Sequence, residues 1–423
     1  MNVLYYLKSF PKISETFILN EIYALEQAGH NVAVFALGDP GHDFTHTELS
    51  EIEAPIKYAG PLEYTDTLDL ISGELLRPAV AQNAISNAIS TNVSIYDIAH
   101  LIRTKQCIEF IESLPWEVDI VHSHFATREK FACTNVAAYY DVPFTITTHA
   151  YDIYREIDEE TEQLLQAADR VVTISTYNRN YLRERCLEET PVDVVHAGIR
   201  PEKFSPDGMC LDNRILTVGR FTSKKGLRYA LEAVSIVARD RPDLEYHLVG
   251  SGSQKAELSR LVRKLGIEKN VTFLNNISDK ELITEYDRAR CFLLPSVITS
   301  SGERDGIPVV LMESMAMKTP PVSTLVSGIP ELVDHETNGI LVKPRDPEAT
   351  AEALQRMFRN DAEWADYRRR GREKVVEEFN VSKEISRLEQ VFDAARSGRN
   401  GIASADGHET IRRGTRSQRD SPN

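Results

Sequence analysis

The chain has 423 residues, of which 42% are hydrophobic and 27% charged, a balance typical of globular proteins. This length exceeds that of one ordinary hydrophobic core and predicts two domains. The formal net charge of −15 argues against a nucleic-acid partner, because nucleic-acid phosphates are bound by basic faces. A nucleotide ligand is not excluded, since a local pair of cations suffices for a diphosphate.

The five cysteines are scattered along the chain without a Cys-x-x-Cys pair, a pattern typical of free thiols in a reducing compartment. The first residues, MNVLYYLKSFPKISETF, lack the apolar run and cleavage site of a secretory signal. No window approaches the roughly 18 apolar residues of a membrane span. The sequence therefore predicts a cytoplasmic protein and leaves peripheral attachment to the inner face of the cell membrane open.

Short apolar runs alternate with helical patterns along the first half of the chain. Val3–Leu7 predicts a buried strand, a helical stripe around Phe17 to Leu25 follows, and Asn31–Leu37 predicts the next strand. We expect loop and short strand over 39–66 and mostly helix over 67–113. Further strands are predicted at Val118–His122, Phe144–Thr148, Arg170–Ile174 and Val192–His196, with helices near 129–140 and 176–186. Repeated strand–helix units predict a parallel sheet covered on both faces.

The pattern breaks after a first domain predicted at 1–200, and a linker is expected at 201–213. A second strand–helix series predicts another such domain at 214–375. Its strands are expected at Arg214–Val218, Leu244–Val249, Val271–Leu274, Cys291–Leu294, 320–323 and 339–343, and its helices from 226, at 254–265, 279–288 and 307–317, and from 347 onward. We expect a helix over 376–395 to pack back toward the first domain. Segment 396–423 lacks apolar periodicity, which predicts disorder.

Two such sheets in one chain leave a cleft between them, and their ligands bind beyond the carboxyl ends of the strands. At one such end, the segment LTVGRFTSKKGL places Arg220 and Lys225 between a predicted strand and a predicted helix. Two cations near the positive end of a helix dipole suit a diphosphate. Solvated loop cations are the alternative interpretation.

The segment GERDGIPVVLMESMA places Asp305 just before a predicted helix and Glu313, eight residues on, inside it. Helical rise would separate the two carboxylates by about 12 Å, which suits the two ends of an extended nucleotide sugar. Carboxyl pairs that act on one glycosidic bond lie closer, at roughly 5–9.5 Å. The alternative is an acid that favours the helix dipole together with a surface glutamate.

Three segments in this order resemble the family 4, or group 1, retaining glycosyltransferases: GRFTSKKG, the segment in which Asp305 is followed eight residues later by Glu313, and SGIPELV. The resemblance covers about residues 1–395 and implies the α/β GT-B fold, in which two Rossmann-like, doubly wound parallel-sheet domains face a cleft. The opening FPKISETFILNEI resembles a branch that acts in bacterial exopolysaccharide synthesis, such as that of colanic acid. The implied activity is transfer of a sugar from a nucleotide-sugar donor to a glycan or lipid-linked acceptor, with retention of configuration.

The resemblance assigns Arg220 and Lys225 to the donor diphosphate, Glu313 to the ribose hydroxyls and Asp305 to the donor sugar. The family usually has glutamate where this chain has Asp305, so we expect a closer sugar or help from Glu303. The identity of the sugar is left undecided. In SGIPELV, Ser327–Gly328 replace the paired glycines of the family, and Gly328 is expected to lie near the donor.

Gly250 and Gly252, in LVGSG, resemble the family's nucleotide-side loop, although a tight turn explains them equally well. His149 ends the strand FTITTH, where the family places a catalytic histidine that faces the donor sugar and phosphate across the cleft; a structural role is the alternative. His124, at the end of DIVHSH, is a candidate for contact with the acceptor. Ser14 is either an acceptor-side residue or a helix cap.

Bond cleavage develops charge on the leaving diphosphate, so positive charge from Arg220, Lys225 and helix N-termini is the main catalytic requirement. The sequence has no Asp-x-Asp-like pair that stands out as a metal site, and we expect neither a metal nor a cofactor. Front-face attack by the acceptor, with the departing phosphate taking the proton, is the working hypothesis. Rival interpretations are an epimerase of the same fold and a catalytically silent sugar-nucleotide-binding subunit of a polysaccharide assembly complex.

Overall fold

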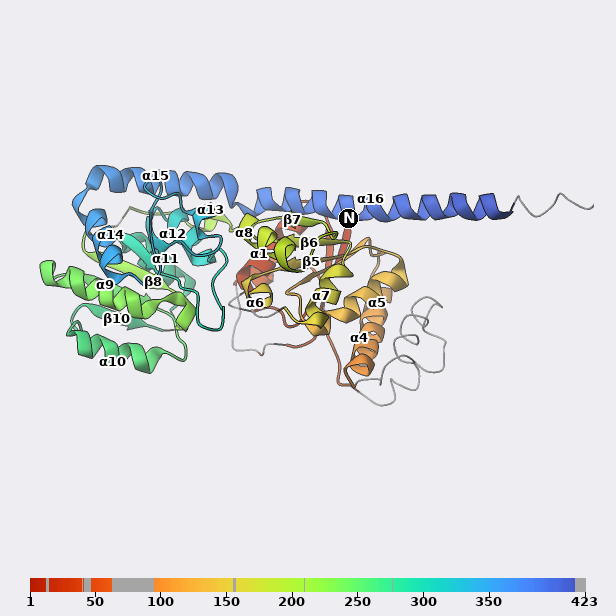
Figure 1. Cartoon of the computed structure of the whole chain (residues 1–423), viewed down its shortest axis with the longest axis horizontal. Helices are drawn as coiled ribbons and strands as arrows, with labels where there is room; N and C mark the ends of the chain where they lie inside the picture. Colours follow the sequence, from red (N-terminus) through yellow and green to blue (C-terminus); the bar gives the residue numbers. More distant parts are fainter. Residues whose placement is uncertain are drawn as a thin grey trace, which may run out of the picture.

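The computed structural model describes residues 1–12, 15–39, 41, 47–62, 95–154, 157–208, 210–275 and 277–414. The chain forms two parallel sheets that lie side by side, each with its own set of helices (Figure 1). In the described residues, no helix combines the length and apolar character that a membrane crossing requires.

The N-terminal sheet has seven strands in the order β3-β2-β1-β4-β5-β6-β7, all parallel. The strands are β1 (Asn2–Leu7), β2 (Asn31–Ala36), β3 (Ile56–Tyr58), β4 (Ile120–His124), β5 (Phe144–Thr148), β6 (Arg170–Thr173) and β7 (Val192–Val194). The helices are α1 (Thr16–Gln27), α4 (Ile95–Glu112), α5 (Phe131–Tyr140), α6 (Ala150–Ile153), α7 (Glu159–Gln166) and α8 (Thr176–Arg185). Of the helical segment expected at 67–113, α4 is described and 67–94 lie outside the described residues.

Apolar side chains on both faces of β1 explain why this strand lies in the middle of the sheet. Val3, Tyr5 and Leu7 pack into one core cluster with residues of α1. Leu4 and Tyr6 point to the other face and pack with residues of α4 and α5. A strand buried on both faces needs such a nearly continuous apolar run, because successive side chains alternate between the faces.

The C-terminal sheet has six strands in the order β10-β9-β8-β11-β12-β13, again all parallel. The strands are β8 (Arg214–Val218), β9 (Glu245–Val249), β10 (Val271–Leu274), β11 (Cys291–Leu294), β12 (Pro321–Thr324) and β13 (Ile340–Val342). The helices are α9 (Leu227–Asp240), α10 (Lys255–Leu265), α11 (Asp279–Arg288), α12 (Val309–Ala316), α13 (Ile329–Leu332), α14 (Pro347–Arg359) and α15 (Asp361–Glu378). β3 falls within 39–66, where a short strand without bounds was expected, and the bounds of the other strands lie within two residues of those predicted from the sequence.

Both sheets reverse their winding direction at one point. The chain runs outward from β1 or β8 to one edge of the sheet and then crosses back to β4 or β11. Parallel α/β sheets bind ligands in the crevice at this switch point, beyond the carboxyl ends of the strands. The residues that follow β1 and β4 in one domain, and β8 and β11 in the other, are therefore the first candidates for a site.

The last helix, α16 (Val381–Gly414), returns to the N-terminal domain. Val381, Ile385, Leu388 and Phe392 recur at helical spacing and pack into the same core cluster as Val3 of β1. Figure 1 shows α15 and α16 running along the same side of the two domains. The part of α16 between Val381 and Ala395 thus belongs to the N-terminal core.

The backbone of α16 continues to Gly414, into the segment 396–423 for which the sequence predicts disorder. Ion pairs hold the first residues of this segment: Arg396 Nη2 lies 2.9 Å from an Asp119 oxygen, and Arg399 Nε lies 2.8 Å from an Asp169 oxygen. The sequence prediction relied on apolar periodicity, which charged contacts of this kind do not produce. Residues 415–423 lie outside the described part of the chain.

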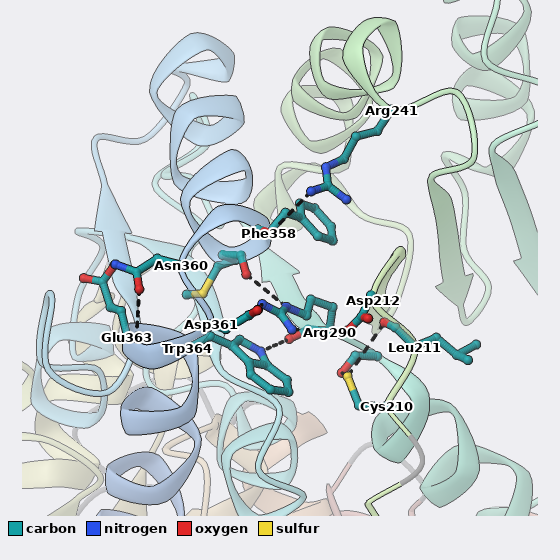
Figure 2. A network of polar contacts seen from close by, with 12 residues as sticks. Cys210, Leu211, Asp212, Arg241, Arg290, Phe358, Asn360, Asp361, Glu363 and Trp364 are labelled. Atoms are coloured by element: carbon teal, nitrogen blue, oxygen red, sulfur yellow. Dashed lines mark hydrogen bonds and ion pairs between the residues drawn. The ribbon is translucent and has the colours of Figure 1, made fainter.

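A polar network around Arg290, drawn in Figure 2, joins the linker between the domains to the C-terminal domain. The Arg290 side chain is buried, donates to the Met357 carbonyl oxygen and pairs with Asp212 and Asp361. Its guanidinium lies over the Trp364 ring, and the indole N–H donates to the Arg290 carbonyl at 2.7 Å. One arginine at the start of β11 therefore connects residue 212 with the α14–α15 junction.

Candidate active site

The loop after β8 carries the predicted cations, and it places two lysines on one carboxylate. Lys225 Nζ lies 3.0 Å from Asp305 Oδ2, and Lys224 Nζ lies 3.2 Å from Asp305 Oδ1. The hydroxyl of Ser296, two residues beyond β11, donates to Oδ2 at 2.8 Å. These side chains are largely buried, so the cluster is a built feature of the switch point between β8 and β11.

The charges of this cluster are coupled. Burial alone would raise the pKa of Asp305, but Lys225 and Lys224 outweigh it and hold that pKa at about 2. Burial also lowers the pKa of Lys225, and Asp305 opposes that shift. With both lysines charged and one carboxylate ionised, the cluster carries one surplus positive charge, which suits an anionic ligand.

Arg220 lies on the same loop but in a different environment. Its side chain is exposed, and among the described residues no hydrogen bond or ion pair holds its guanidinium. Arg220 lies close enough to Lys225 to lower the pKa of that lysine. The structure thus brings the two predicted cations together and adds Lys224, which the sequence reasoning missed although it stands next to Lys225.

The structure changes the predicted geometry of the acidic pair. The helix expected from residue 307 begins at Val309. Asp305 lies in the loop before it, so the helical rise per residue cannot be used for the part of the Asp305–Glu313 separation that precedes Val309. Glu313 lies in α12, where its carboxylate accepts a hydrogen bond from the hydroxyl of the buried Tyr286 at 2.8 Å. Glu303, the expected neighbour of Asp305, is half-buried in the same loop. The assignments of these acids to a donor remain predictions.

Gly250 and Gly252 lie in the loop after β9 with φ of +136° and +153°, values that favour glycine. A Cβ at Gly252 would lie 2.6 Å from the Phe221 carbonyl oxygen, and one at Gly250 would collide with the Gly219 carbonyl. The two glycines therefore let this loop pack against the loop that carries Arg220. This close approach supports the tight-turn interpretation, and a donor contact remains a prediction.

Gly328 lies at the contact between the domains. A Cβ there would lie 2.9 Å from the Cβ of Ser175, the N-cap of α8. Three residues on, the Glu331 carboxylate accepts the backbone N–H groups of Thr176 at 2.9 Å and Tyr177 at 2.8 Å. The C-terminal domain thus contributes an anion to the start of a helix of the N-terminal domain. Sequence reasoning missed this role of Glu331, although the residue belongs to the SGIPELV segment.

In the N-terminal domain, the two predicted histidines are neighbours. His124 Nδ1 lies 3.0 Å from His149 Nε2, and His124 Nε2 lies 2.8 Å from Glu21 Oε1. Glu21 Oε1 also accepts the hydroxyl of Tyr5 at 2.7 Å. Burial lowers the pKa of His124 to about 3 and that of His149 well below its usual value. Glu21 and Tyr5 were not predicted; Ser14, the other acceptor-side candidate, lies outside the described residues.

Asp152 anchors the turn that follows His149. Its carboxylate accepts the backbone N–H groups of His149 at 2.7 Å and Ala126 at 2.8 Å. Burial raises the pKa of Asp152 to about 7, and these hydrogen bonds oppose that shift. The carboxylate therefore connects the end of β5 to the residues that follow β4.

The halves of the candidate site meet at Gly306. A Cβ on this residue, the neighbour of Asp305, would lie 3.0 Å from Ile174 Cδ1 and 3.7 Å from Ala150 Cβ. Ala150 directly follows His149, and Ile174 follows β6. The loop that carries Asp305 in one domain therefore packs beside the start of α6 in the other. This interdomain contact has Asp305, with its partners Lys224 and Lys225, on the side of the C-terminal domain. On the side of the N-terminal domain it has His149.

Comparison with known proteins identifies a family for each half of the chain. The family described as glycosyltransferase family 4 matches residues 14–203, and the family described as glycosyl transferases group 1 matches residues 211–374. The amylovoran biosynthesis glycosyltransferase of Erwinia amylovora is 27% identical, over 93% of this chain and 99% of its own length. A putative colanic acid biosynthesis glycosyltransferase of Escherichia coli K12 is 29% identical, over 93% of this chain and 100% of its own length.

Solved structures share the fold at low sequence identity. A sucrose-phosphate synthase from Thermosynechococcus elongatus superimposes with a TM-score of 0.71 at 21% identity, over 94% of this chain and 100% of that one. An Anabaena protein crystallised with UDP and glucose gives 0.67 at 15% identity, over 93% and 100%. With two parallel sheets and a family match in each half, the chain belongs to the family 4, or group 1, glycosyltransferases and has the GT-B fold.

Proposed function

We propose that this protein transfers a sugar from a nucleotide-sugar donor to a glycan or lipid-linked acceptor in exopolysaccharide biosynthesis, with retention of anomeric configuration. The observation that carries the proposal is the buried Lys224–Lys225–Asp305 cluster at the β8/β11 switch point. Two kinds of likeness support it. Similar proteins are named for amylovoran and colanic acid biosynthesis, and a structural neighbour holds UDP and glucose.

In the proposed reaction, the donor diphosphate binds at Lys225 and Arg220. Departure of the nucleoside diphosphate concentrates negative charge on the leaving oxygen, and fixed cations stabilise that charge most effectively where water is excluded. Lys225 is fixed by Asp305, whereas the exposed Arg220 closes onto the ligand. Because these cations supply the charge, the proposal requires neither a metal ion nor another cofactor.

We assign Asp305 to the sugar end of the donor and Glu313 to its ribose. Asp305 directly precedes Gly306, which packs beside Ala150 of the N-terminal domain. Glu313 lies farther along the chain in α12, with Tyr286 as its partner. The acceptor attacks from the side on which the diphosphate departs, and the departing phosphate takes the proton. Retention follows from that geometry.

The donor is identified by binding, and turnover then tests the activity. Purified protein is screened by thermal shift against UDP-, GDP-, ADP- and dTDP-sugars, because a ligand bound only to the folded state at 100 times its Kd adds about 2.7 kcal/mol. We expect one nucleotide to stand out and release of the nucleoside diphosphate when acceptor is added. Binding without turnover across a broad set of acceptors would instead support the catalytically silent subunit.

A further inference from the structure

A chain of hydrogen-bonded side chains runs through the N-terminal domain and ends at His149. It connects Tyr5 on β1, Glu21 on α1, His124 on β4 and His149 at the start of α6, with successive distances of 2.7, 2.8 and 3.0 Å. His124 is 1% exposed and His149 6% exposed, so water does not compete for the contact between the two rings, whereas the Glu21 side chain is 15% exposed. A buried chain of this kind has a defined direction, because each neutral imidazole carries one donor and one acceptor nitrogen.

The direction follows from the Glu21 end. Burial raises the pKa of Glu21, whereas His122 and the hydrogen bond from Tyr5 oppose that shift. Glu21 Oε1 accepts the Tyr5 hydroxyl, and an oxygen without a proton can only accept in its contact with His124 Nε2 as well. His124 Nε2 therefore carries the proton of that ring. His124 Nδ1 is then the acceptor, so the proton in its contact with His149 belongs to His149 Nε2.

The other end of the chain is held through the backbone. His149 is the N-cap of α6, and its backbone N–H donates to Asp152 Oδ1 at 2.7 Å. This bond fixes the backbone from which the His149 ring projects. The tautomer of His149 follows from the Glu21 end.

We propose that Glu21 and His124 are positioning residues that hold the His149 imidazole neutral, in one orientation, with its proton on Nε2. His149 then brings no positive charge to a leaving diphosphate, and that charge comes from Lys225 and Arg220. The contribution of His149 is orientation: its ring fixes the start of α6, where Ala150 packs beside Gly306. This last step rests on the proposed function, whereas the tautomer does not.

A metal ion is the chemical alternative for the same cluster. One ligand atom each from Glu21, His122 and His124 lie within 4.8 Å of one another. The contacts favour the hydrogen-bonded chain, because His124 Nε2 stands at hydrogen-bond distance from Glu21 and His122 Nε2 is 3.1 Å from the Thr147 hydroxyl. A metal on His124 Nε2 would reverse the chain and place the His149 proton on Nδ1. The tautomer of His149 therefore separates the two cases.

The experiment is long-range 1H–15N correlation spectroscopy on protein with 15N-labelled histidine rings, with the His149 signals assigned through His149→Gln. We expect the Nε2–H tautomer for His124 and His149 at neutral pH, and no metal in stoichiometric amount by elemental analysis. A proton on Nδ1 of His149, a doubly protonated ring or a stoichiometric metal would overturn the proposal. This measurement on the unaltered protein does not depend on any enzymatic activity.

Variants test the part played by Glu21. Glu21→Gln keeps a carbonyl acceptor and should preserve the His149 tautomer, whereas Glu21→Leu removes it and should give a mixture of tautomers. Thr145→Val is the matched control, since it removes a buried hydroxyl that contacts His122 at 2.8 Å but lies outside the chain. An unchanged His149 signal in Glu21→Leu, or an equal change in Thr145→Val, contradicts the proposal.

Turnover supplies a second measurement once a donor is known. We expect Glu21→Leu to lower kcat about tenfold with an unchanged KM for the donor, and Glu21→Gln to restore most of the loss. Equal activity in Glu21→Leu and the unaltered protein would overturn the positioning role. If no donor is turned over at all, the proposed function fails, and the tautomer still decides the state of His149.

Discussion

At the residue scale, Asp305 determines the state of the candidate site. Without a ligand, its carboxylate is the anion for both Lys224 and Lys225, and Ser296 fixes its orientation. A donor diphosphate would become a second anion at Lys225. In the proposed function, Asp305 and the donor diphosphate would therefore share Lys225.

Replacing Asp305 with asparagine should destabilise the protein. Breaking a buried ion pair by removing one partner costs about 3 kcal/mol, because the remaining charge stays buried. Denaturant unfolding measures the loss, with the exposed Asp279→Asn as the control. Adding the nucleoside diphosphate found in the screen should stabilise Asp305→Asn more than the unaltered protein, since the ligand replaces the missing anion. Equal stabilisation would contradict the shared-cation interpretation.

The same carboxylate predicts a dependence on pH. The folded-state pKa of Asp305 is about 2, below the ordinary value of 3.8. Its contribution is therefore present above the ordinary pKa and is lost as the pH falls through the folded value. The difference in unfolding free energy between the unaltered protein and Asp305→Asn should shrink from pH 5 toward pH 2, as followed by denaturant titration. A difference that stays constant over this range would be inconsistent with the ion pairs.

At the element scale, Arg290 holds the linker and two helices together. Its contacts with Asp212, Met357 and Trp364 come from elements that are distant in sequence. Both carboxylate partners are largely exposed, so most of the benefit comes from the buried carbonyl contact and the ring. Arginine is needed here because a planar guanidinium stacks on the indole while it donates to several acceptors.

We expect Arg290→Lys to lower the free energy of unfolding by about 2 kcal/mol, since lysine loses the stacking and leaves the Met357 carbonyl without a well-placed donor. Chemical denaturation followed by Trp364 fluorescence reports on the same place. Arg239→Lys, at an exposed position of α9, is the matched control and should be neutral. A loss no larger than that of the control would show that the network in Figure 2 adds little to stability.

At the scale of the whole molecule, charged contacts join the two domains. His196, which follows β7, lies 4.0 Å from Glu331 of the C-terminal domain and 3.6 Å from Glu384 of α16. Arg387 of α16 also approaches the ring, at 3.4 Å. Burial lowers the pKa of His196, but the two carboxylates outweigh it and raise that pKa to about 9. His196 is therefore charged at neutral pH and joins three parts of the fold.

This contact predicts a loss of stability in alkali. Because the folded-state pKa of about 9 lies above the ordinary 6.5, the contribution of His196 is complete below the ordinary value and disappears as the pH rises through the folded one. Unfolding of the unaltered protein and of His196→Gln should therefore converge between pH 7 and pH 10. The exposed His335→Gln is the control. A difference between the proteins that grows in this range would contradict the assignment.

Much of the fold was predictable, because parallel sheets leave a local signal. The bounds of Phe144–Thr148 and Arg214–Val218 agree with the apolar runs that mark strands buried on both faces. The nearness of His124 and His149 also follows from the sequence, since each stands at the end of neighbouring parallel strands. Glu21 was not predictable, because its place depends on how α1 is rotated over the sheet.

The site in the C-terminal domain shows the same limit. Arg220 and Lys225 were recognisable from one short segment, but the pairing of Lys225 with Asp305 brings together residues that are 80 positions apart. Asp305 was expected just before the helix and lies there, whereas the helix start was predicted two residues early, at 307 instead of Val309, whose N-cap is Pro308. Such contacts depend on the tertiary arrangement of loops, which apolar periodicity does not encode.

The most direct test of the central claim is release of the nucleoside diphosphate from the identified donor by the purified protein in the presence of acceptor. The unaltered protein should release the nucleoside diphosphate. Lys225→Ala and Arg220→Ala should each lose at least about a hundredfold in kcat/KM while remaining folded. Arg228→Ala should have an unchanged kcat/KM. Arg228 is a fair control, because it is a cation of the adjoining helix α9 that pairs with Glu232 of the same helix. Near-normal turnover in both Lys225→Ala and Arg220→Ala would contradict the assignment of the donor site.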